Sequence, residues 1–384
     1  MQEPTAIPLS LYIHFPWCVR KCPYCDFNSH EAKGSIPERQ YIDALLSDLD
    51  HALPDIWGRN IQSIFMGGGT PSLFSPECMD HLLAQLRARL NFSPQIEITM
   101  EANPGTAEQG KFSEFFAVGI NRLSIGIQSF DNVQLQRLGR IHNRREAFRA
   151  VEIAHAAGFT NLNLDLMFGL PKQTHAEALA DLQNAIDLEP THLSHYQLTI
   201  EPNTFFYHQP PETPDDDQLF EMQQQCQTLL ADRGYTQYEV SAYAQKNQQC
   251  LHNLNYWQFG DYLGLGAGAH SKLSRGQPLE IMRQWRVKNP QDYLDKVSTQ
   301  QHLGGEQVLS TADLPVEFML NALRLVHGFD KSVFCERTGL SLEQIATPLH
   351  QAIEAGLLEQ DEQRLWPSSK GLHFLNELLQ YFMP

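Results

Sequence analysis

Three cysteines lie close together near the start of the chain, at Cys18, Cys22 and Cys25. They form a C-x3-C-x2-C pattern directly after an apolar, strand-like run at residues 9–15. One short loop therefore supplies three thiolates, one fewer than a cubic 4Fe-4S cluster needs, and one iron is left open to an outside ligand. The pattern predicts a cluster that binds and activates a small molecule, and not one that only passes electrons.

A zinc site is the structural alternative for the same cysteines. His14 or His30 could then be the fourth ligand. Zinc sites usually pair two cysteine knuckles that are far apart in the sequence, and the chain has no second knuckle. The spacing after a first strand, with five further β/α units behind it, favours the iron–sulfur interpretation.

Length and composition limit the class of protein. A chain of 384 residues with 42% hydrophobic residues predicts more than one domain, one of them a large α/β unit. No apolar run has the length of a membrane span, and the first residues lack the basic and apolar regions of a signal peptide. With seven cysteines, this predicts reduced thiols in the cytoplasm. The net charge of −17 argues against a general nucleic-acid partner.

Strand-like and helical runs alternate over the first two hundred residues. The expected strands are residues 10–15, 63–67, 97–102, 122–128, 161–168 and 192–200. The expected helices between them are residues 38–53, 76–90, 107–118, 144–157 and 175–188. Six β/α units in a row predict a parallel sheet with helices outside, as an open sheet or a partial barrel. In barrel-like folds the chemistry gathers at the carboxyl ends of the strands.

The second half of the chain reads differently. Residues 215–234 are expected to form a helix and residues 235–244 a strand, which closes a first unit over residues 1–240. Residues 241–290, rich in glycine and glutamine, are expected to be an irregular connecting segment. Residues 291–384 predict a mostly helical, winged-helix-like domain with a hairpin that turns at Asp361 and Glu362. Residues 310–384 carry 5 basic and 10 acidic residues, a net charge of −5, which favours a packing or lid domain over DNA binding.

Residues that could bind a ligand stand at the ends of the expected strands. The second strand ends in a triple glycine followed by Thr70, and Gly68 and Gly69 would let the backbone approach a ligand carboxylate closely. Further polar residues could line one pocket at a barrel mouth. These are Glu101, Gln128 and Asp165, at or near the ends of the third, fourth and fifth strands, and Arg140, in the helical stretch after the fourth. The carboxylates could bind a sulfonium, an amine or ribose hydroxyls, and Arg140 could pair with a carboxylate.

With these motifs, residues 12–200 resemble the radical S-adenosylmethionine (SAM) superfamily. The resemblance implies an α/β fold with a parallel six-stranded partial (β/α)6 barrel, and a 4Fe-4S cluster on Cys18, Cys22 and Cys25. It also implies that SAM binds the open iron through its amino and carboxylate groups and is cleaved to a 5′-deoxyadenosyl radical. The residues that it implies for the SAM site are Tyr12, Gly68, Gly69, Thr70, Glu101, Gln128, Arg140 and Asp165.

Within the superfamily, the chain is similar to the oxygen-independent coproporphyrinogen III dehydrogenase (oxidase-like) group. The similarity lies in residues 12–18, the Gly-Gly-Gly-Thr-Pro run, residues 127–130 and residues 165–172. Two departures argue against porphyrinogen decarboxylation. The dehydrogenase has a further cysteine where this chain has Phe27, and it carries a long N-terminal extension where only 17 residues precede Cys18.

The stretch His252-Asn-Leu-Asn-Tyr256-Trp257 resembles the signature of the heme chaperone branch of this group. The resemblance implies that His252 contacts heme, as an axial iron ligand, with Tyr256 and Trp257 offering flat faces to the porphyrin. On its chemistry alone, this is a single histidine beside aromatic residues, which is more often part of a core. Residues 260–270 could instead form a tight turn system that closes the domain.

These resemblances imply a cytoplasmic heme chaperone that carries a 4Fe-4S cluster with exchangeable SAM and has no catalytic residue of its own assigned. The implied partners are heme, an acceptor hemoprotein such as a membrane respiratory cytochrome, and a reducing flavodoxin or ferredoxin, with transient membrane contact but no nucleic acid. A monomer and a cluster-dependent dimer are both open. The first alternative is the dehydrogenase itself, which removes two propionate carboxyl groups. The second is a radical SAM enzyme with another substrate, in which the stretch around His252 is structural.

Overall fold

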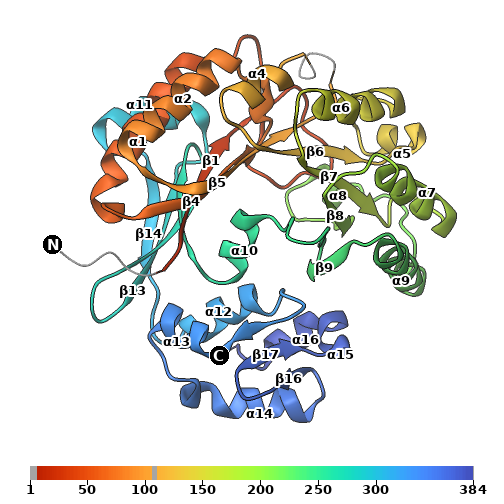
Figure 1. The fold of residues 1–384 in the computed structure, drawn as a ribbon, viewed down its shortest axis with the longest axis vertical. Helices are drawn as coiled ribbons and strands as arrows, with labels where there is room; N and C mark the ends of the chain where they lie inside the picture. The colour runs from red at the N-terminus through yellow and green to blue at the C-terminus, as the bar shows by residue number, and fades with distance from the viewer. Residues whose placement is uncertain (1–6, 106–109, 384) are drawn as a thin grey trace.

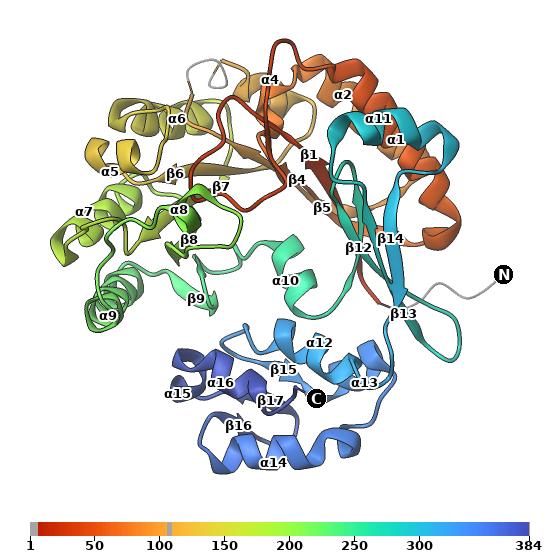
Figure 2. The ribbon, with the colours of Figure 1, turned by 180° about the vertical axis from the view of Figure 1, so that it is seen from behind.

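A curved sheet with helices on its outer side forms the larger part of the molecule, and a smaller C-terminal part packs below it (Figures 1 and 2). The computed structural model describes residues 7–105 and 110–383. Within these residues the large sheet has twelve strands in the order β14-β13-β12-β11-β1-β4-β5-β6-β7-β8-β10-β9. The first three residues of the expected helix at 107–118 lie outside the described residues.

The middle of this sheet consists of the six parallel strands that the sequence predicts. Their bounds are β1 Leu9–Phe15, β4 Asn60–Gly68, β5 Asn91–Ala102, β6 Arg122–Gln128, β7 Asn161–Phe168 and β8 His192–Gln197. Successive side chains of a strand point to opposite faces. In β1, Leu11 and Ile13 belong to the main hydrophobic core, whereas the alternate residues Ser10 and Tyr12 make polar and aromatic contacts to other strands and to α10.

Helices connect these strands or follow the last of them, and most lie along the outside of the sheet (Figure 1). Their bounds are α1 Glu38–Ile56, α2 Pro76–Arg89, α4 Phe112–Ala117, α5 Asn132–Arg137, α6 Arg144–Ala156, α7 His175–Ile186, α8 Phe205–His208 and α9 Asp216–Asp232, with the 3-10 turn η1 Pro71–Leu73. Capping boxes fix three of the helix starts, at Asn143, Thr174 and Asp215. Each uses a side-chain oxygen to satisfy a backbone N–H that has no partner within the helix. The partial (β/α)6 barrel expected from the sequence is confirmed.

The expectation of an irregular segment at residues 241–290 is wrong for most of its length, because both edges of the barrel sheet are extended there. β11 runs parallel beside β1, and β12, β13 and β14 follow antiparallel, while β10 and β9 extend the opposite edge beside β8. The bounds are β9 Thr236–Glu239, β10 Ala242–Ala244, β11 Asp261–Leu265, β12 His270–Arg275, β13 Glu280–Arg286 and β14 Leu303–Val308. The divisions predicted at residues 240 and 290 stay predictions.

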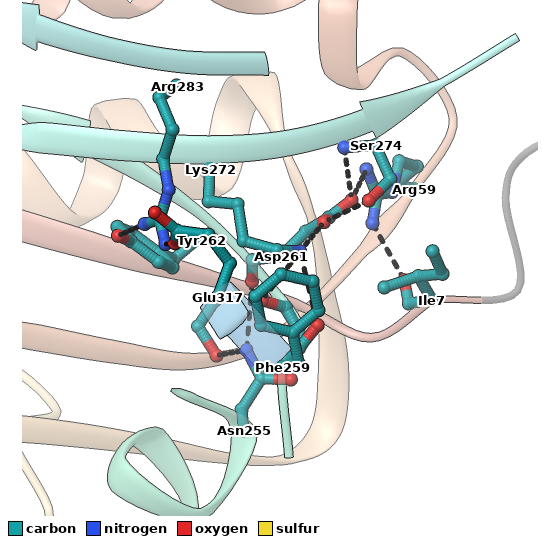
Figure 3. Close-up of polar contacts among 12 residues, drawn as sticks. Ile7, Arg59, Asn255, Phe259, Asp261, Tyr262, Lys272, Ser274, Arg283 and Glu317 are labelled. Carbon is teal, nitrogen blue, oxygen red and sulfur yellow. Dashed lines mark hydrogen bonds and ion pairs between the residues drawn. The ribbon is translucent and has the colours of Figure 1, made fainter. Parts of the chain in front are cut away.

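A buried carboxylate joins the edge strands to the barrel (Figure 3). Asp261 accepts from Lys272 and Arg59, each with an N···O distance of 2.8 Å, and from both the backbone N–H and the hydroxyl of Ser274. Burial alone would raise the pKa of Asp261, but the two cations and these hydrogen bonds lower it. Since a buried charge is tolerated only when it is fully paired, this cluster explains how polar residues can occupy the sheet interior here.

A second buried ion pair joins the sheet extension to α1. Asp48 of α1 pairs with Arg286 at the end of β13, at an N···O distance of 3.0 Å, and it also accepts from His302 and Tyr293. Tyr293 lies on α11, Pro290–Lys296, which packs against α1. The extension is therefore held to the outer helices as well as to β1.

The C-terminal part has its own hydrophobic core, centred on Phe318, Phe329 and Phe334. It combines a three-stranded sheet in the order β15-β17-β16 with several short helices, which confirms the helix-rich C-terminal domain. The bounds are α12 Leu314–Ala322, β15 Phe329–Asp330, α13 Lys331–Thr338, η3 Leu342–Ile345, α14 Ala346–Glu354, β16 Leu358–Gln360, β17 Arg364–Pro367, α15 Ser369–His373 and α16 Leu375–Gln380. Within the described residues, no helix combines the length and the apolar composition needed to cross a bilayer.

Candidate functional site

The cysteine loop follows β1 and is closed by a small parallel pair of strands. β2, Trp17–Cys18, pairs with β3, His30–Glu31, so the loop between them carries Cys22 and Cys25. The Cys25 N–H donates to the Cys22 carbonyl, at 3.2 Å, which makes the loop turn tightly between these two residues. All three cysteines are half-buried, and burial raises the pKa of the Cys18 and Cys25 thiols.

The donors around the sulfur atoms are those expected near an iron–sulfur cluster. The Thr70 hydroxyl donates to Cys18 Sγ at 3.5 Å, and Arg140 Nη1 donates to Cys22 Sγ at 3.6 Å. Hydrogen bonds to thiolate sulfur help to set the reduction potential of such clusters. Within residues 7–105 and 110–383, the side chains form no group of three or more His, Cys, Asp or Glu that could already hold a metal ion. The type of the donors and their common loop, and not a preformed geometry, are what fit a cluster.

The two histidines of the zinc alternative are both engaged elsewhere. His14 Nε2 donates to the Asn28 carbonyl at 2.8 Å, and its Nδ1 accepts from the Tyr12 hydroxyl at 3.0 Å. His30 Nε2 lies 3.2 Å from Asn28 Oδ1. Burial lowers the pKa of His14 to about 4, so its ring is neutral at pH 7. These two hydrogen bonds place the proton of the neutral ring on Nε2, and His14 thereby holds the Asn28 end of the cysteine loop in place.

The triple glycine lies against the start of the cysteine loop. Gly69 N–H donates to the Phe15 carbonyl at 2.7 Å, and Thr70 N–H donates to the Trp17 carbonyl at 2.8 Å. Gly68 has φ of 105°, and a Cβ atom there would lie 2.2 Å from the His14 ring. Only glycine fits this close approach. The backbone N–H groups expected to hold a ligand carboxylate thus donate to protein oxygens, because Gly68 N–H also donates to Glu101, at 3.1 Å.

Two carboxyl groups expected in the SAM site lie inside the barrel. Burial, and after it the charge of Asp165, raises the pKa of Glu101 to about 8. Asp165 accepts from Ser124 at 3.2 Å and from Asn163 at 2.8 Å, although burial still raises its pKa. With a pKa of about 8, Glu101 favours its protonated form at pH 7 in the absence of a cation. A bound cation would favour the ionised forms.

Gln128 and Arg140 complete the expected set. Gln128 has a left-handed backbone, with φ of 68°, and its Oε1 accepts from the Tyr196 hydroxyl at 2.8 Å. Arg140 Nη2 donates to Asn103 Oδ1 at 2.5 Å and to the Gly126 carbonyl at 2.7 Å. Asn103 in turn donates to Thr70 Oγ1 at 2.8 Å. A continuous path of hydrogen bonds therefore runs from Cys18 through Thr70, Asn103 and Arg140 to Cys22.

Asn103 is the site residue that the sequence analysis missed. It stands directly after β5 ends at Ala102, two residues beyond Glu101. A polar residue just past a strand end, followed by Pro104, was a usable signal. Its importance arises from contacts to Thr70 and Arg140, which come from two other segments and which no local pattern reveals.

The stretch expected to contact heme forms a helix at the floor of the barrel. α10, Leu251–Trp257, begins where Glu97 of β5 accepts from the backbone N–H groups of Leu251 and His252. Asn255 Nδ2 donates to the Asp261 carbonyl at 2.8 Å (Figure 3). It also donates to Ser10 Oγ at 3.0 Å. α10 is therefore hydrogen-bonded to β1, β5 and β11.

The aromatic rings of this stretch contact different parts of the chain. The buried His252 ring lies 5.1 Å from the Phe65 ring and 6.3 Å from the Tyr12 ring, measured between centroids. The Trp257 ring instead carries the Arg324 guanidinium at 4.5 Å, and Tyr256 packs on Tyr262. Burial lowers the pKa of His252 to about 3. Heme contact at His252 stays a prediction, and the three rings do not offer one common face to a porphyrin in this arrangement.

The barrel and the cysteine loop define the class of this protein. The model of the radical SAM superfamily matches residues 12–185, and that of the HemN C-terminal domain matches residues 309–374. The chain is 49% identical to the heme chaperone HemW of Haemophilus influenzae and 48% identical to that of Escherichia coli. The alignments cover 99% of both chains in the first case and 98% of both in the second. The chain belongs to the HemW family of the radical SAM superfamily.

More distant relatives extend the comparison. The mouse mitochondrial radical S-adenosyl methionine domain-containing protein 1 is 33% identical, over 100% of this chain and 89% of its own length. The solved structure of the E. coli coproporphyrinogen III oxidase HemN, described as a radical SAM enzyme, superposes with a TM-score of 0.83 at 25% identity, covering 99% of this chain and 91% of HemN. Membership of the superfamily implies a 4Fe-4S cluster and SAM as cofactors.

Proposed function

We propose that this chain is a heme chaperone, which binds heme and transfers it to an acceptor hemoprotein. The observation that carries the proposal is its 49% identity to a curated heme chaperone over nearly the whole of both chains. A match of that extent includes the barrel, the stretch from His252 to Trp257 and the C-terminal domain together. We further propose a cytoplasmic location and a membrane respiratory cytochrome as acceptor.

We propose that Cys18, Cys22 and Cys25 hold the 4Fe-4S cluster. When bound, the cluster and SAM supply one-electron chemistry that can cleave the sulfonium of SAM. The set that we propose for SAM comprises Tyr12, Gly68, Gly69, Thr70, Glu101, Gln128, Arg140 and Asp165. Among these, Arg140 holds Asn103 and Cys22 in place, and the two buried carboxyl groups can ionise toward a cation.

We propose His252 as the heme contact of this chain. Since its ring is buried on the barrel floor, access for heme requires that α10 move or that the barrel interior admit one edge of the porphyrin. Its low pKa favours this role chemically, because a neutral imidazole is the form that binds iron. A flavodoxin or ferredoxin is the proposed reductant, and the chain is proposed to act as a monomer or as a dimer formed with the cluster.

Heme transfer tests this function directly. The reconstituted protein would be loaded with heme, separated from excess and mixed with an apo-cytochrome of the b type. We expect the absorbance spectrum of the heme-loaded cytochrome to appear faster with this protein as the heme donor than with heme–albumin as the donor. Transfer no faster than from heme–albumin would contradict the proposal.

The oxidative decarboxylation of coproporphyrinogen III is the second candidate, favoured by the TM-score of 0.83 to HemN. Phe27 stands against it, because it occupies the position of a further cysteine in the dehydrogenase. Its side chain is 60% exposed, and its carbonyl accepts from Lys21 and from Ser29 N–H. Formation of protoporphyrinogen by the reduced, anaerobic protein with SAM would establish this alternative.

A further inference from the structure

An opening to solvent lies beside two of the cluster cysteines. The pocket is lined by Cys18 and Cys22, by Thr70, Asn103 and Arg140 of the candidate site, and by Val19, Arg20, Gly139 and Ile141. Val19 is 51% exposed and Ile141 is 56% exposed, so two apolar side chains stand at the rim without cover. A protein seated on this rim would lie directly outside the sulfur atoms that hold the cluster.

The chain runs from this pocket directly into a basic strip, since Ile141 lines the pocket and Arg144 follows three residues later. Residues 132–153 carry five arginines and two glutamates, a net charge of 5 − 2 = +3 in a chain whose net charge is −17. A second, larger pocket in this segment is lined by residues that include Arg144, Arg145, Arg149 and one acidic residue, Glu152. We name Val19, Arg20, Ile141, Arg144, Arg145 and Arg149 the basic rim.

We propose that the basic rim is the docking site of an acidic one-electron carrier protein that reduces the cluster. The proposal rests on the proposed cluster at Cys18, Cys22 and Cys25. A positive patch on an otherwise acidic protein attracts a partner of opposite charge to one place and repels it elsewhere. Exposed apolar residues beside the charges give the water-excluding centre that such interfaces need.

The electron balance of the step is simple. A flavin hydroquinone anion on the carrier gives one electron and becomes the neutral semiquinone. Cys18, Cys22 and Cys25 would hold the cluster that takes up this electron, and no proton needs to move. The protein therefore contributes only the position and charge of the docking site.

An anionic membrane surface could also be attracted to these arginines, but the helix that carries most of them, α6, has no free apolar face to insert into a membrane. The apolar side of α6, with Ala147, Ala150 and Val151, is buried in the main core. Membrane-binding helices need a free apolar face to insert below the headgroups. The basic rim therefore fits a protein partner better than a lipid surface.

Charge reversal tests the docking site. Arg145 and Arg149 are exposed and one helical turn apart, so the double variant R145E/R149E changes the rim without touching the cluster pocket. The control is K246E/K370E, which changes the net charge equally at exposed lysines outside the rim. For each reconstituted holoprotein, binding to a bacterial flavodoxin is measured by titration, and cluster reduction by flavodoxin hydroquinone is followed by EPR.

We expect the rim variant to bind flavodoxin on the order of tenfold more weakly at low salt, and the control to bind as the wild type does. The difference should disappear near 1 M salt, where charges are screened within about 3 Å. Reduction by dithionite should remain unchanged in both variants. If the rim variant were unstable, R145Q/R149Q would replace it, with a smaller loss expected.

Equal flavodoxin affinity in the rim variant and the control would overturn the proposal. So would a loss confined to binding of phosphatidylglycerol vesicles, which would assign the rim to a membrane surface. A heme titration of the same variants keeps this proposal separate from the proposed function. Weak flavodoxin binding by the rim variant, with its heme binding intact, supports the docking site. If the wild type itself did not bind heme, only the proposed chaperone function would be overturned.

Discussion

His252 Nδ1 lies 3.2 Å from Ser63 Oγ, although 189 residues separate the two in the chain. The Ser63 hydroxyl donates onward to Ser10, so the imidazole is joined to two barrel strands. The stretch that resembles a heme chaperone signature is thus also the floor of the barrel. Substitutions there can change folding, heme binding or both, and an experiment must separate these effects.

Substituting the two partners of this hydrogen bond separates them. If His252 contacts heme, His252→Ala should lose most heme affinity, whereas Ser63→Ala should retain it because the imidazole remains. Ser63→Ala should lose about 1–3 kcal/mol of stability, since buried partners are left without their hydrogen bonds. His252→Ala should lose more, because it also leaves a cavity beside the Phe65 ring. Heme titration and urea unfolding measure the two effects. Wild-type heme affinity in His252→Ala would assign the stretch to a purely structural role.

Cys18→Ser should lose the iron–sulfur cluster almost completely. The proposed site has only three thiolate ligands, so the loss of one leaves too few to hold the cluster, and a serine hydroxyl is a poor replacement. Iron analysis and visible absorbance after anaerobic reconstitution measure the loss. Cys335→Ser is the matched control, because that cysteine is exposed in the C-terminal domain. Equal iron content in the two variants would contradict the assignment of the cluster.

Glu101→Gln should change how stability depends on pH. The pKa of Glu101 is raised to about 8 in the folded chain, from an ordinary value of 4.5. The folded state keeps this proton where the unfolded state releases it, so stability decreases as the pH rises from about 4.5 to about 8. The variant lacks this loss.

Urea unfolding of the cluster-free protein measures the effect at several pH values. The free energy of unfolding of the variant, relative to that of the wild type, should increase by on the order of a few kcal/mol as the pH rises to about 8. Above that pH the difference should remain constant. Glu114→Gln, an exposed site on α4, provides the control. A difference that does not depend on pH would show that the Glu101 carboxyl is ionised in the fold.

Asp48→Asn should destabilise the sheet extension strongly. Its carboxylate pairs with the buried Arg286, and removing one partner of a buried pair typically costs about 3–5 kcal/mol. Asp43→Asn on the same helix is the matched control, because the Arg39–Asp43 pair is exposed and such pairs contribute about 0–1 kcal/mol. Thermal or urea unfolding of both variants compares them. Similar losses in the two variants would mean that the buried pair is replaced by water or by another partner.

The parallel barrel could be predicted because each of its strands and helices has a recognisable pattern in its own stretch of sequence. Apolar strands such as residues 161–168 alternate with amphipathic helices, and capping residues such as Asn143 mark where helices begin. The edge strands β9 and β10 lie within the expected strand at residues 235–244, but β11 to β14 could not be predicted in this way. β14 contains two glycines and is largely exposed, and β12 buries Lys272, which is stable only because Asp261 of β11 neutralises it.

The residues of the candidate site could be placed from the sequence to a similar degree. The cysteine spacing and the glycine run place the loop and its neighbouring strand, and the strand ends supply Glu101 and Asp165. Asn103 was missed because its role depends on Thr70 and Arg140, which come from two other segments. The burial of His252 also follows from long-range contacts, namely those to Ser63, Phe65 and Tyr12, which the local sequence does not reveal.

A heme titration of the anaerobically reconstituted protein tests the central claim most directly. The same sample, reduced and supplied with SAM, would be assayed with coproporphyrinogen III. We expect saturable heme binding at a fixed stoichiometry, measured by absorbance, and no formation of protoporphyrinogen. Turnover of the porphyrinogen without stable heme binding would contradict this claim and would identify the chain as the biosynthetic enzyme.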